Sequence, residues 1–180
     1  MIMRPTSTRD IYGRPLGPFS LIRERQRSYP VDVEGLAGDF GIEVIRKDWP
    51  DNLSGAIGYD KSGYFIIVNS KQSENQQRFT IAHEIGHYIL HRDRIGTDGI
   101  RDDILYQSKL RGVDERAANL LAADILMPAD LLGQAVIDAG GWKNLNRIAE
   151  KLKVSRTALS SRLETLNITD RTVRMMDADV

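Results

Sequence analysis

A short stretch of this chain brings together residues that could bind a metal ion and activate water. It contains His-Glu-x-x-His, with His83 and His87 four residues apart and Glu84 between them. On an α-helix, residues at this spacing share one face with their Cβ atoms about 6 Å apart, so both imidazoles can reach one Zn²⁺ at about 2.0–2.1 Å. Glu84 then points to a neighbouring part of the helix, where it could take a proton from water at the metal without binding the metal itself.

The residues around the motif support this interpretation. Neighbouring positions are apolar or small, including Ile81, Ala82, Ile85 and Gly86, so we expect a buried helix. Burying histidine and glutamate is costly unless a partner compensates them, and a bound cation is such a partner. The alternative is a surface helix with incidental histidines, but all three histidines of the chain lie within residues 83–91. The context therefore favours a metal site.

A third protein ligand is needed, because a catalytic zinc usually takes three and leaves a fourth position for water. His91, Asp114 and Glu115 are the candidates. His91 lies about 6 Å beyond His87 along the helix, which makes ligation together with the first histidine hard. Glu115 begins a second apolar helix and can approach from the side, and Asn119 on the same face could hydrogen-bond a ligand. We therefore predict Glu115 as the ligand and Asp114 as a helix cap; the alternative for Glu115 is a solvated acid favoured by the helix dipole.

The elements that must position these side chains begin with a small sheet. A helix is expected over residues 31–40, followed by strands over residues 42–45, 53–59 and 64–68. The last two strands are joined through residues 60–63, a hairpin-type connection. Because the strand over residues 64–68 is almost wholly apolar, we expect it deep in the sheet, near the metal helix.

Helices make up the rest of the predicted fold. The motif helix is expected over residues 74–90, with Ser73 as N-cap and Gln76 as its capping-box partner. The polar residues 92–112 predict a long loop that could line a substrate cleft. Further helices are expected over residues 113–127, 129–139, 145–152 and 156–166. Ser155 would cap the last of these, and the last two have helix-turn-helix spacing.

The composition limits the classes of protein that are possible. The chain has 180 residues, of which 41% are hydrophobic and 28% charged, as in a globular protein. The formal net charge is zero, which argues against a general affinity for nucleic acid. There is no cysteine, so any zinc must be held by histidine and carboxylate ligands. We find no signal-peptide pattern and no apolar run of the roughly 20 residues that cross a bilayer, so we expect a cytoplasmic protein.

Three stretches of the sequence are shared with one known family: Asn69 together with residues 78–91, residues 115–128, and residues 152–166. On these stretches the chain resembles the ImmA/IrrE family of zinc metallo-endopeptidases. The resemblance implies an α+β fold with a zincin-like metalloprotease core, made of a small three-stranded sheet plus helices. A C-terminal helix-turn-helix-like helix pair would follow this core.

The resemblance also implies roles for particular residues. Carried over by position, His83, His87 and Glu115 would hold Zn²⁺, and Glu84 would be the catalytic acid and base. Family members commonly have a second glutamate two residues before the asparagine of the second stretch, and this chain has Ala117 there. This departure leaves Glu115 as the acid on which the site depends.

Composition and spacing predict a division of the chain, and the resemblance implies a function. Residues 1–27, which lie outside the resemblance, would be a flexible Arg/Pro/Gly-rich extension, 28–139 the metallopeptidase core, 140–168 the helix-turn-helix-like segment and 169–180 a tail. The implied function is cleavage of a protein substrate in stress response or mobile-element regulation. The substrate would be a helix-turn-helix transcriptional repressor or antitoxin, encoded nearby. We expect no membrane partner.

A different class of function competes with this one. The protein could be a DNA- or protein-binding regulator with a zinc site but no significant peptidase activity. The last two predicted helices carry basic residues that could contact DNA, namely Arg147, Lys151, Lys153, Arg156 and Arg162. The zero net charge and the family resemblance weigh against DNA binding. For a peptidase, the group that stabilises the oxyanion is left open among Tyr88, His91 and Tyr106.

Overall fold

A three-stranded mixed sheet flanks the helix that carries the histidines. The structure, a computed structural model, describes residues 16–95 and 112–168. Strands β1 (Ile42–Lys47), β2 (Gly55–Asp60) and β3 (Gly63–Asn69) are ordered β1-β3-β2. β1 runs parallel to β3, and β2 runs antiparallel to it through the predicted hairpin. β3 is thus the central strand, as its apolar sequence predicts, and the α+β fold is confirmed.

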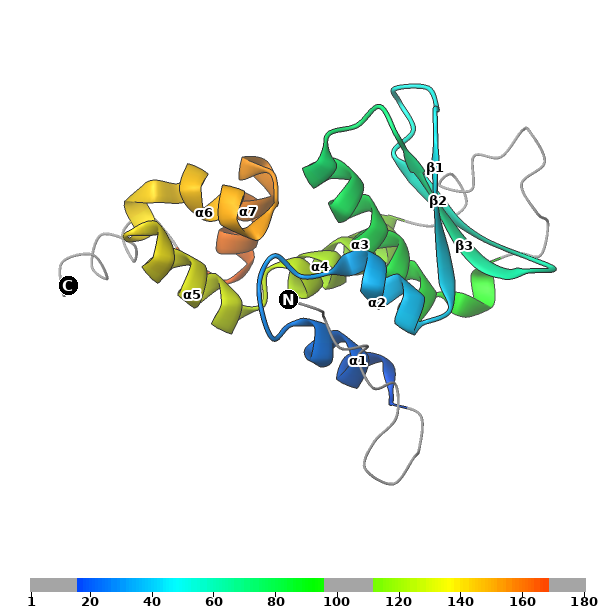
Figure 1. The fold of residues 1–180 in the computed structure, drawn as a ribbon, viewed down its shortest axis with the longest axis horizontal. Helices are drawn as coiled ribbons and strands as arrows, with labels where there is room; N and C mark the ends of the chain where they lie inside the picture. The colour runs from blue at the N-terminus through cyan, green and yellow to red at the C-terminus, as the bar shows by residue number, and fades with distance from the viewer. Residues whose placement is uncertain (1–15, 96–111, 169–180) are drawn as a thin grey trace, which may run out of the picture.

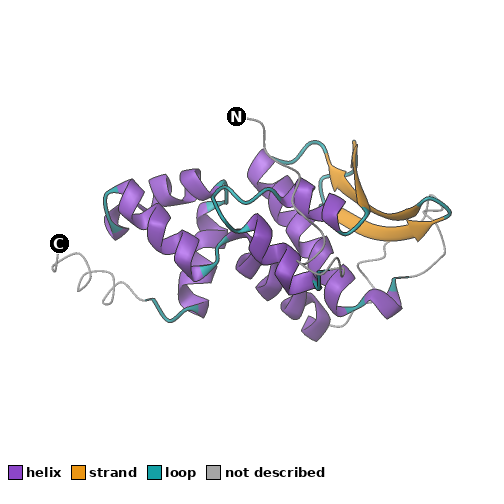
Figure 2. Cartoon of the chain, turned by 60° about the horizontal axis from the view of Figure 1, so that its bottom comes forward, coloured by secondary structure: helices purple, strands orange, loops and turns teal. Residues whose placement is uncertain are grey.

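The described helices form two groups, one beside the sheet and one away from it (Figure 1). Helices α2, α3 and α4 pack beside the sheet, whereas α5, α6 and α7 lie together away from it, as the turned view also shows (Figure 2). In chain order the helical elements are α1 (Pro18–Arg25), α2 (Val33–Asp39), α3 (Glu74–Leu90), η1 (Arg92–Arg94), α4 (Gly112–Leu126), α5 (Ala129–Ala139), η3 (Trp142–Asn144), α6 (Leu145–Leu152) and α7 (Arg156–Thr165).

Helix α3 begins where the capping box predicts. The Ser73 hydroxyl accepts a hydrogen bond from the Gln76 backbone, and the Gln76 side chain returns to the Ser73 backbone, which satisfies two otherwise unpaired N–H groups. From Thr80 to His87 every residue of α3 is buried. The middle of α3 is therefore a core helix, and its polar side chains need partners inside the protein.

Asn69, at the end of β3, holds the connection between β1 and β2. Its fully buried side-chain amide donates hydrogen bonds to the carbonyl oxygens of Trp49, Pro50 and Leu53, at 3.2, 3.1 and 2.8 Å. Its side-chain oxygen accepts from the Lys71 backbone at 3.0 Å. One side chain thus fixes the turn before β2 and the exit towards α3.

The close approach of α4 to α3 occurs at Gly86. A Cβ atom at this position would lie 3.0 Å from the carbonyl oxygen of Ala118 and 3.2 Å from its Cα. Any side chain larger than hydrogen would therefore push the two helices apart. Because α4 carries Glu115, this contact also sets the distance between Glu115 and the histidines.

The N-terminal boundary differs from the sequence-based prediction. We predicted a flexible extension through residue 27, but α1 forms within it and buries Leu21 and Ile22 in the core. Arg25 at its end bonds the carboxylates of Asp39 at 2.6 Å and Asp32 at 2.9 Å. These acids lie around the next helix, so the order of α1 comes from contacts that a local pattern does not reveal.

Helix α5 packs against α6 across the predicted boundary at residue 140. Ser155 caps α7 as predicted, accepting from the Ala158 backbone at 3.0 Å. Most of the predicted loop over residues 92–112, and the predicted tail, lie outside the described residues.

Among residues 16–95 and 112–168, no single helix is both long and apolar enough to cross a membrane. α4 and α5 satisfy that length and composition only when taken together, and they are bent by 51° where they meet.

The Gly86 contact gives a testable prediction. We expect Gly86→Val to lower the free energy of unfolding by about 1–3 kcal/mol, because the added carbons overpack the α3–α4 contact. Urea unfolding followed by circular dichroism measures this, and zinc affinity should fall as well. Gly133→Val is the matched control, since a Cβ there meets nothing within 4 Å. Equal effects of the two substitutions would show that the close approach is not the constraint.

Candidate metal centre

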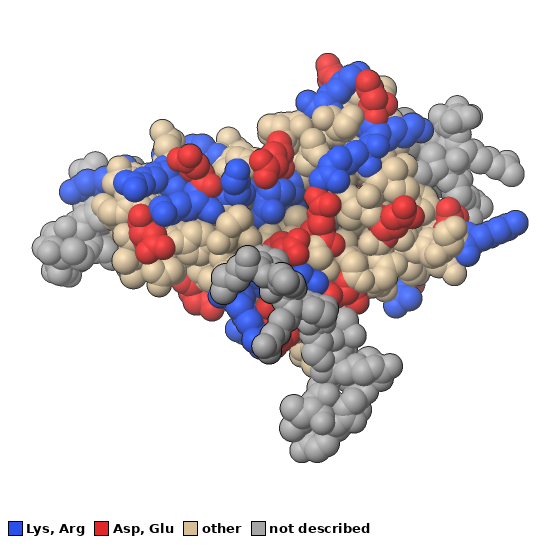
Figure 3. Space-filling model, viewed as in Figure 1, with Lys and Arg blue, Asp and Glu red and all other residues tan. Residues whose placement is uncertain are grey.

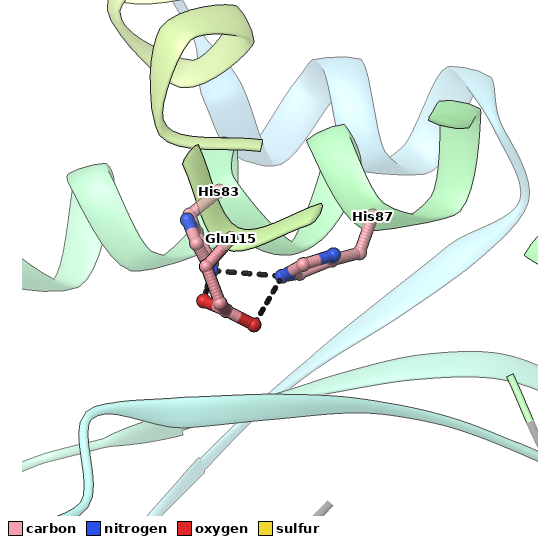
Figure 4. Close-up of side chains that lie close together, drawn as sticks. All are labelled: His83, His87 and Glu115. Atoms are coloured by element: carbon pink, nitrogen blue, oxygen red, sulfur yellow. Dashed lines mark hydrogen bonds and ion pairs between the residues drawn. The ribbon is translucent and has the colours of Figure 1, made fainter. Parts of the chain in front are cut away.

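Two helices bring the three predicted ligands to one point. His83 and His87 project from α3 and Glu115 from the first turn of α4, and their side chains point toward one another (Figure 4). The two Nε2 atoms lie 2.9 Å apart, and each lies 3.3 Å from an oxygen of Glu115. One ligand atom from each residue can be chosen within 4.8 Å of the others, so this cluster could hold a metal ion.

The surrounding hydrogen bonds assign the protons of both imidazoles. His83 Nδ1 lies 3.0 Å from the side-chain oxygen of Asn119, an acceptor, so the proton of His83 sits on Nδ1. His91 Nε2 lies 3.3 Å from Asp114, so His91 carries its proton there and its Nδ1 is an acceptor. His87 Nδ1 lies 3.1 Å from that acceptor and therefore donates to it. Both Nε2 atoms are left as bare lone pairs.

This proton assignment makes a cation the natural occupant of the cluster. Two lone pairs and a carboxylate facing one another repel unless a positive charge lies between them. The Oε1 atom of Glu115 is buried and has no hydrogen-bond partner among the described residues, as expected for an oxygen that belongs to a metal. The residues present therefore fit a metal ion, with nitrogen and oxygen donors of the kinds that zinc takes.

Burial keeps the two histidines neutral. Desolvation is the largest influence on both and lowers the pKa of His83; it lowers the pKa of His87 to about 4, with help from the neighbouring histidines. Glu115 opposes the shift of His83 but does not overcome it. The contacts of Glu115 with these rings are therefore not ion pairs near neutral pH, and both rings are in the form that binds metals.

Glu84 lies beside the cluster and outside the ligand set. Its side chain is buried, and burial, followed by repulsion from Glu115, raises its pKa to about 8. The backbone N–H of Ile57 in β2 donates a hydrogen bond to it and partly opposes this shift. A cation at the cluster would favour the charged carboxylate and lower the pKa toward neutrality. Such a group is suited to accept and return a proton.

His91 and Asp114 have roles that the sequence did not reveal. Asp114 was predicted to cap α4, but α4 begins at Gly112, and Asp114 contacts His91 and bonds Arg94 instead. His91 is outside the cluster of ligands and orients His87. A signal was present: His87 and His91 repeat the four-residue spacing of the motif, and Asp114 directly precedes Glu115, the predicted ligand.

The candidates for oxyanion stabilisation are only partly described. The ring of Tyr88 packs against Phe40 and Tyr64, with ring centroids 5.6 and 4.9 Å away. Tyr106 lies outside the described residues. His91 is occupied between His87 and Asp114.

Comparisons with known proteins show similarity to metalloproteases. The family model for the IrrE N-terminal-like domain, a peptidase family, matches residues 37–164. The radiation response metalloprotease IrrE of Deinococcus radiodurans is 35% identical over 129 residues, which are 68% of this chain and 37% of that protein. The metallopeptidase ImmA of Bacillus subtilis is 28% identical over 95 residues, 53% of each chain. This chain thus spans little more than a third of the length of the Deinococcus relative.

A solved structure shares the fold. A transcriptional regulator of Mycobacterium tuberculosis superposes with a TM-score of 0.56 and 20% sequence identity, over 87% of this chain and 48% of that one. At this identity the similarity concerns the fold alone.

The proton assignment around His91 can be tested through metal affinity. We expect His91→Ala to weaken zinc binding by about 10–100-fold, because His87 loses the partner that fixes its proton and orientation. Competition with a chromophoric chelator measures this. Asp114→Asn keeps the side-chain volume and should give a smaller loss in the same direction, whereas the exposed Asp93→Ala should have none. Unchanged affinity in a folded His91→Ala variant would contradict the assignment.

Proposed function

Because this chain belongs to the ImmA/IrrE family through its IrrE N-terminal-like domain, we propose that it is a zinc-dependent endopeptidase acting on a protein substrate. One observation carries the proposal. Two bare imidazole lone pairs and a carboxylate converge from α3 and α4, and a buried glutamate with a raised pKa lies next to them. This combination supports hydrolysis more than a purely structural metal site.

Zinc is the proposed metal, held by His83, His87 and Glu115. Two histidines and a glutamate form a known ligand set of catalytic zinc, with a fourth position left for reactants. Bound zinc would supply Lewis acidity toward a water molecule and the peptide carbonyl. The hydrogen bonds from His83 to Asn119 and from His87 to His91 hold the two rings in the orientation and tautomer that this requires.

Glu84 is the proposed general base and acid. Its carboxylate accepts the proton of the attacking water and then delivers it to the leaving amine. The Ile57 N–H holds the carboxylate against β2, so Glu84 works from a fixed position. β2 is an edge strand of the described sheet, and we propose that a substrate chain lies along its outer edge.

The proposed substrate is a helix-turn-helix transcriptional repressor or antitoxin encoded nearby, in stress response or mobile-element regulation. The family resemblance supports this choice, and the name of the Deinococcus relative, a radiation response metalloprotease, supports a regulatory setting. Co-expression with such a neighbouring regulator is the direct way to find the cut.

The rival function, a DNA-binding regulator, has less support. Lys and Arg side chains do gather over the half of the molecule formed by the C-terminal helices (Figure 3). However, Arg162 is buried, and it bonds the carbonyl oxygen of Met127 at 3.1 Å and Asp124 at 2.5 Å. Arg162 is therefore a structural residue, which removes one of the basic side chains proposed to contact DNA.

A substitution at Glu84 tests the peptidase proposal. We expect Glu84→Gln to keep about one zinc per chain, because Glu84 is not a ligand, and to lose cleavage by at least about 10²-fold, because proton transfer is removed. Elemental analysis measures the zinc, and gel analysis of the co-expressed regulator measures cleavage. Glu74→Gln, on the exposed start of the same helix, should change neither. Equal cleavage by the wild type and Glu84→Gln would rule out the mechanism.

A further inference from the structure

A cavity of about 590 Å³ lies between three helices that are far apart in the sequence. Its walls come from the first half of α3, from α4 and from α7. On α7 the lining residues recur at spacings of three and four, so one face of that helix is turned to the cavity. The volume is within the range of sites that bind ligands.

The cavity reaches the metal centre. Glu115 and Asn119 both line it. The same two residues contact the histidines, Glu115 through its carboxylate and Asn119 through the 3.0 Å bond to His83. A molecule in the cavity would therefore lie against the ligand set, next to the place where a scissile peptide bond must be held.

The lining suits a polypeptide segment. Apolar contacts are available from Phe79, Leu120 and Ala158, and the lining also includes the hydroxyl of Ser161 and the carboxamide of Asn75. Such a mixture can bury side chains and still hydrogen-bond a peptide backbone. A cavity of this size is too small for a nucleic-acid duplex, whose major groove alone is about 12 Å wide.

The charges of the lining select among side chains. Three charged residues line the cavity: Glu115, Arg116 and Arg162. Glu115 belongs to the metal cluster, and Arg162 is already paired with Asp124. Arg116 is exposed and has no ion-pair partner among the described residues, so its guanidinium is the charge left for an incoming molecule. A carboxylate is the group that a guanidinium pairs with best.

We propose that this cavity binds the substrate segment next to the scissile bond, with an acidic substrate side chain paired to Arg116 and with α7 as a specificity-determining wall. The inference rests on the proposed peptidase function and extends it by naming where the substrate lies and which chemistry is selected. The C-terminal helices then contribute to substrate choice through the cavity face of α7.

The test separates binding from cleavage by using the zinc-loaded Glu84→Gln protein. A displayed library of random 12-residue peptides is selected on it, and a labelled synthetic peptide of the enriched sequence is titrated by fluorescence anisotropy. We expect acidic residues to be enriched. Ser161→Trp, which fills the cavity from an exposed position on α7, should weaken binding at least tenfold. Glu164→Trp, exposed on the same helix and outside the lining, should not.

Charge reversal tests the selected chemistry. Arg116→Glu should weaken binding of the acidic peptide at least tenfold and accept the same peptide with lysine in place of its acid, whereas Arg116→Lys should keep most of the affinity. Zinc content is measured for each variant to show that the centre is intact. Equal binding by the two tryptophan variants, no enriched peptide, or a change of oligomeric state in Ser161→Trp without loss of peptide binding would overturn the inference.

The two proposals fail in different ways. A wild-type protein that binds the peptide through the cavity but cuts neither it nor any neighbouring regulator would refute the peptidase and leave the binding site standing. If the Ser161→Trp and Arg116→Glu variants cleave with the same sequence preference as the wild type, the cavity proposal is refuted and the peptidase proposal stands.

Discussion

The packing of α4 against α3 is the contact on which the site depends. Two of the three proposed ligand side chains are placed by the geometry of a single helix, since His83 and His87 are one turn apart. The third, Glu115, is placed by tertiary structure, and it reaches the histidines only while α4 stays close to α3. The two helices can approach this closely because residue 86 is glycine. A Cβ atom there would lie 3.0 Å from the carbonyl oxygen of Ala118. Gly86, which has no functional side chain, thus determines whether Glu115 reaches the two histidines.

The same packing creates an electrostatic problem that the surrounding residues solve. His83, Glu84 and His87 are all buried, and buried polar groups are destabilising unless they are partnered. The side-chain oxygen of Asn119 accepts the hydrogen bond of His83, and His91 accepts that of His87. His91 in turn contacts Asp114, which is bonded to Arg94. The groups left without a partner are the Nε2 atoms of His83 and His87 and the Glu115 carboxylate, and they face one another. The site is therefore preorganised for a cation, which would be a partner for all three.

Features governed by local sequence could be predicted, and features governed by tertiary contact could not. The capping box of Ser73 and Gln76 predicts the start of α3, and the apolar run of β3 predicts its central position in the sheet. The choice of Glu115 followed from simple reach along and between helices, and the structure places it with the histidines. The role of Asp114 was missed because first-turn acids usually serve the helix itself. The order of α1 was missed because Arg25 finds its partners seven and fourteen residues away.

Helix α4 connects the metal centre to the C-terminal helices. Its first turn carries Glu115, and its last turn carries Asp124, which together with Met127 just beyond holds Arg162 of α7. Asp124 is nine positions after Glu115 along the helix, a rise of about 14 Å. Because one rigid helix spans that distance, the wall formed by α7 keeps a fixed position relative to the metal ligands. The buried Arg162 is therefore better understood as the residue that fixes this spacing than as part of a surface that contacts DNA.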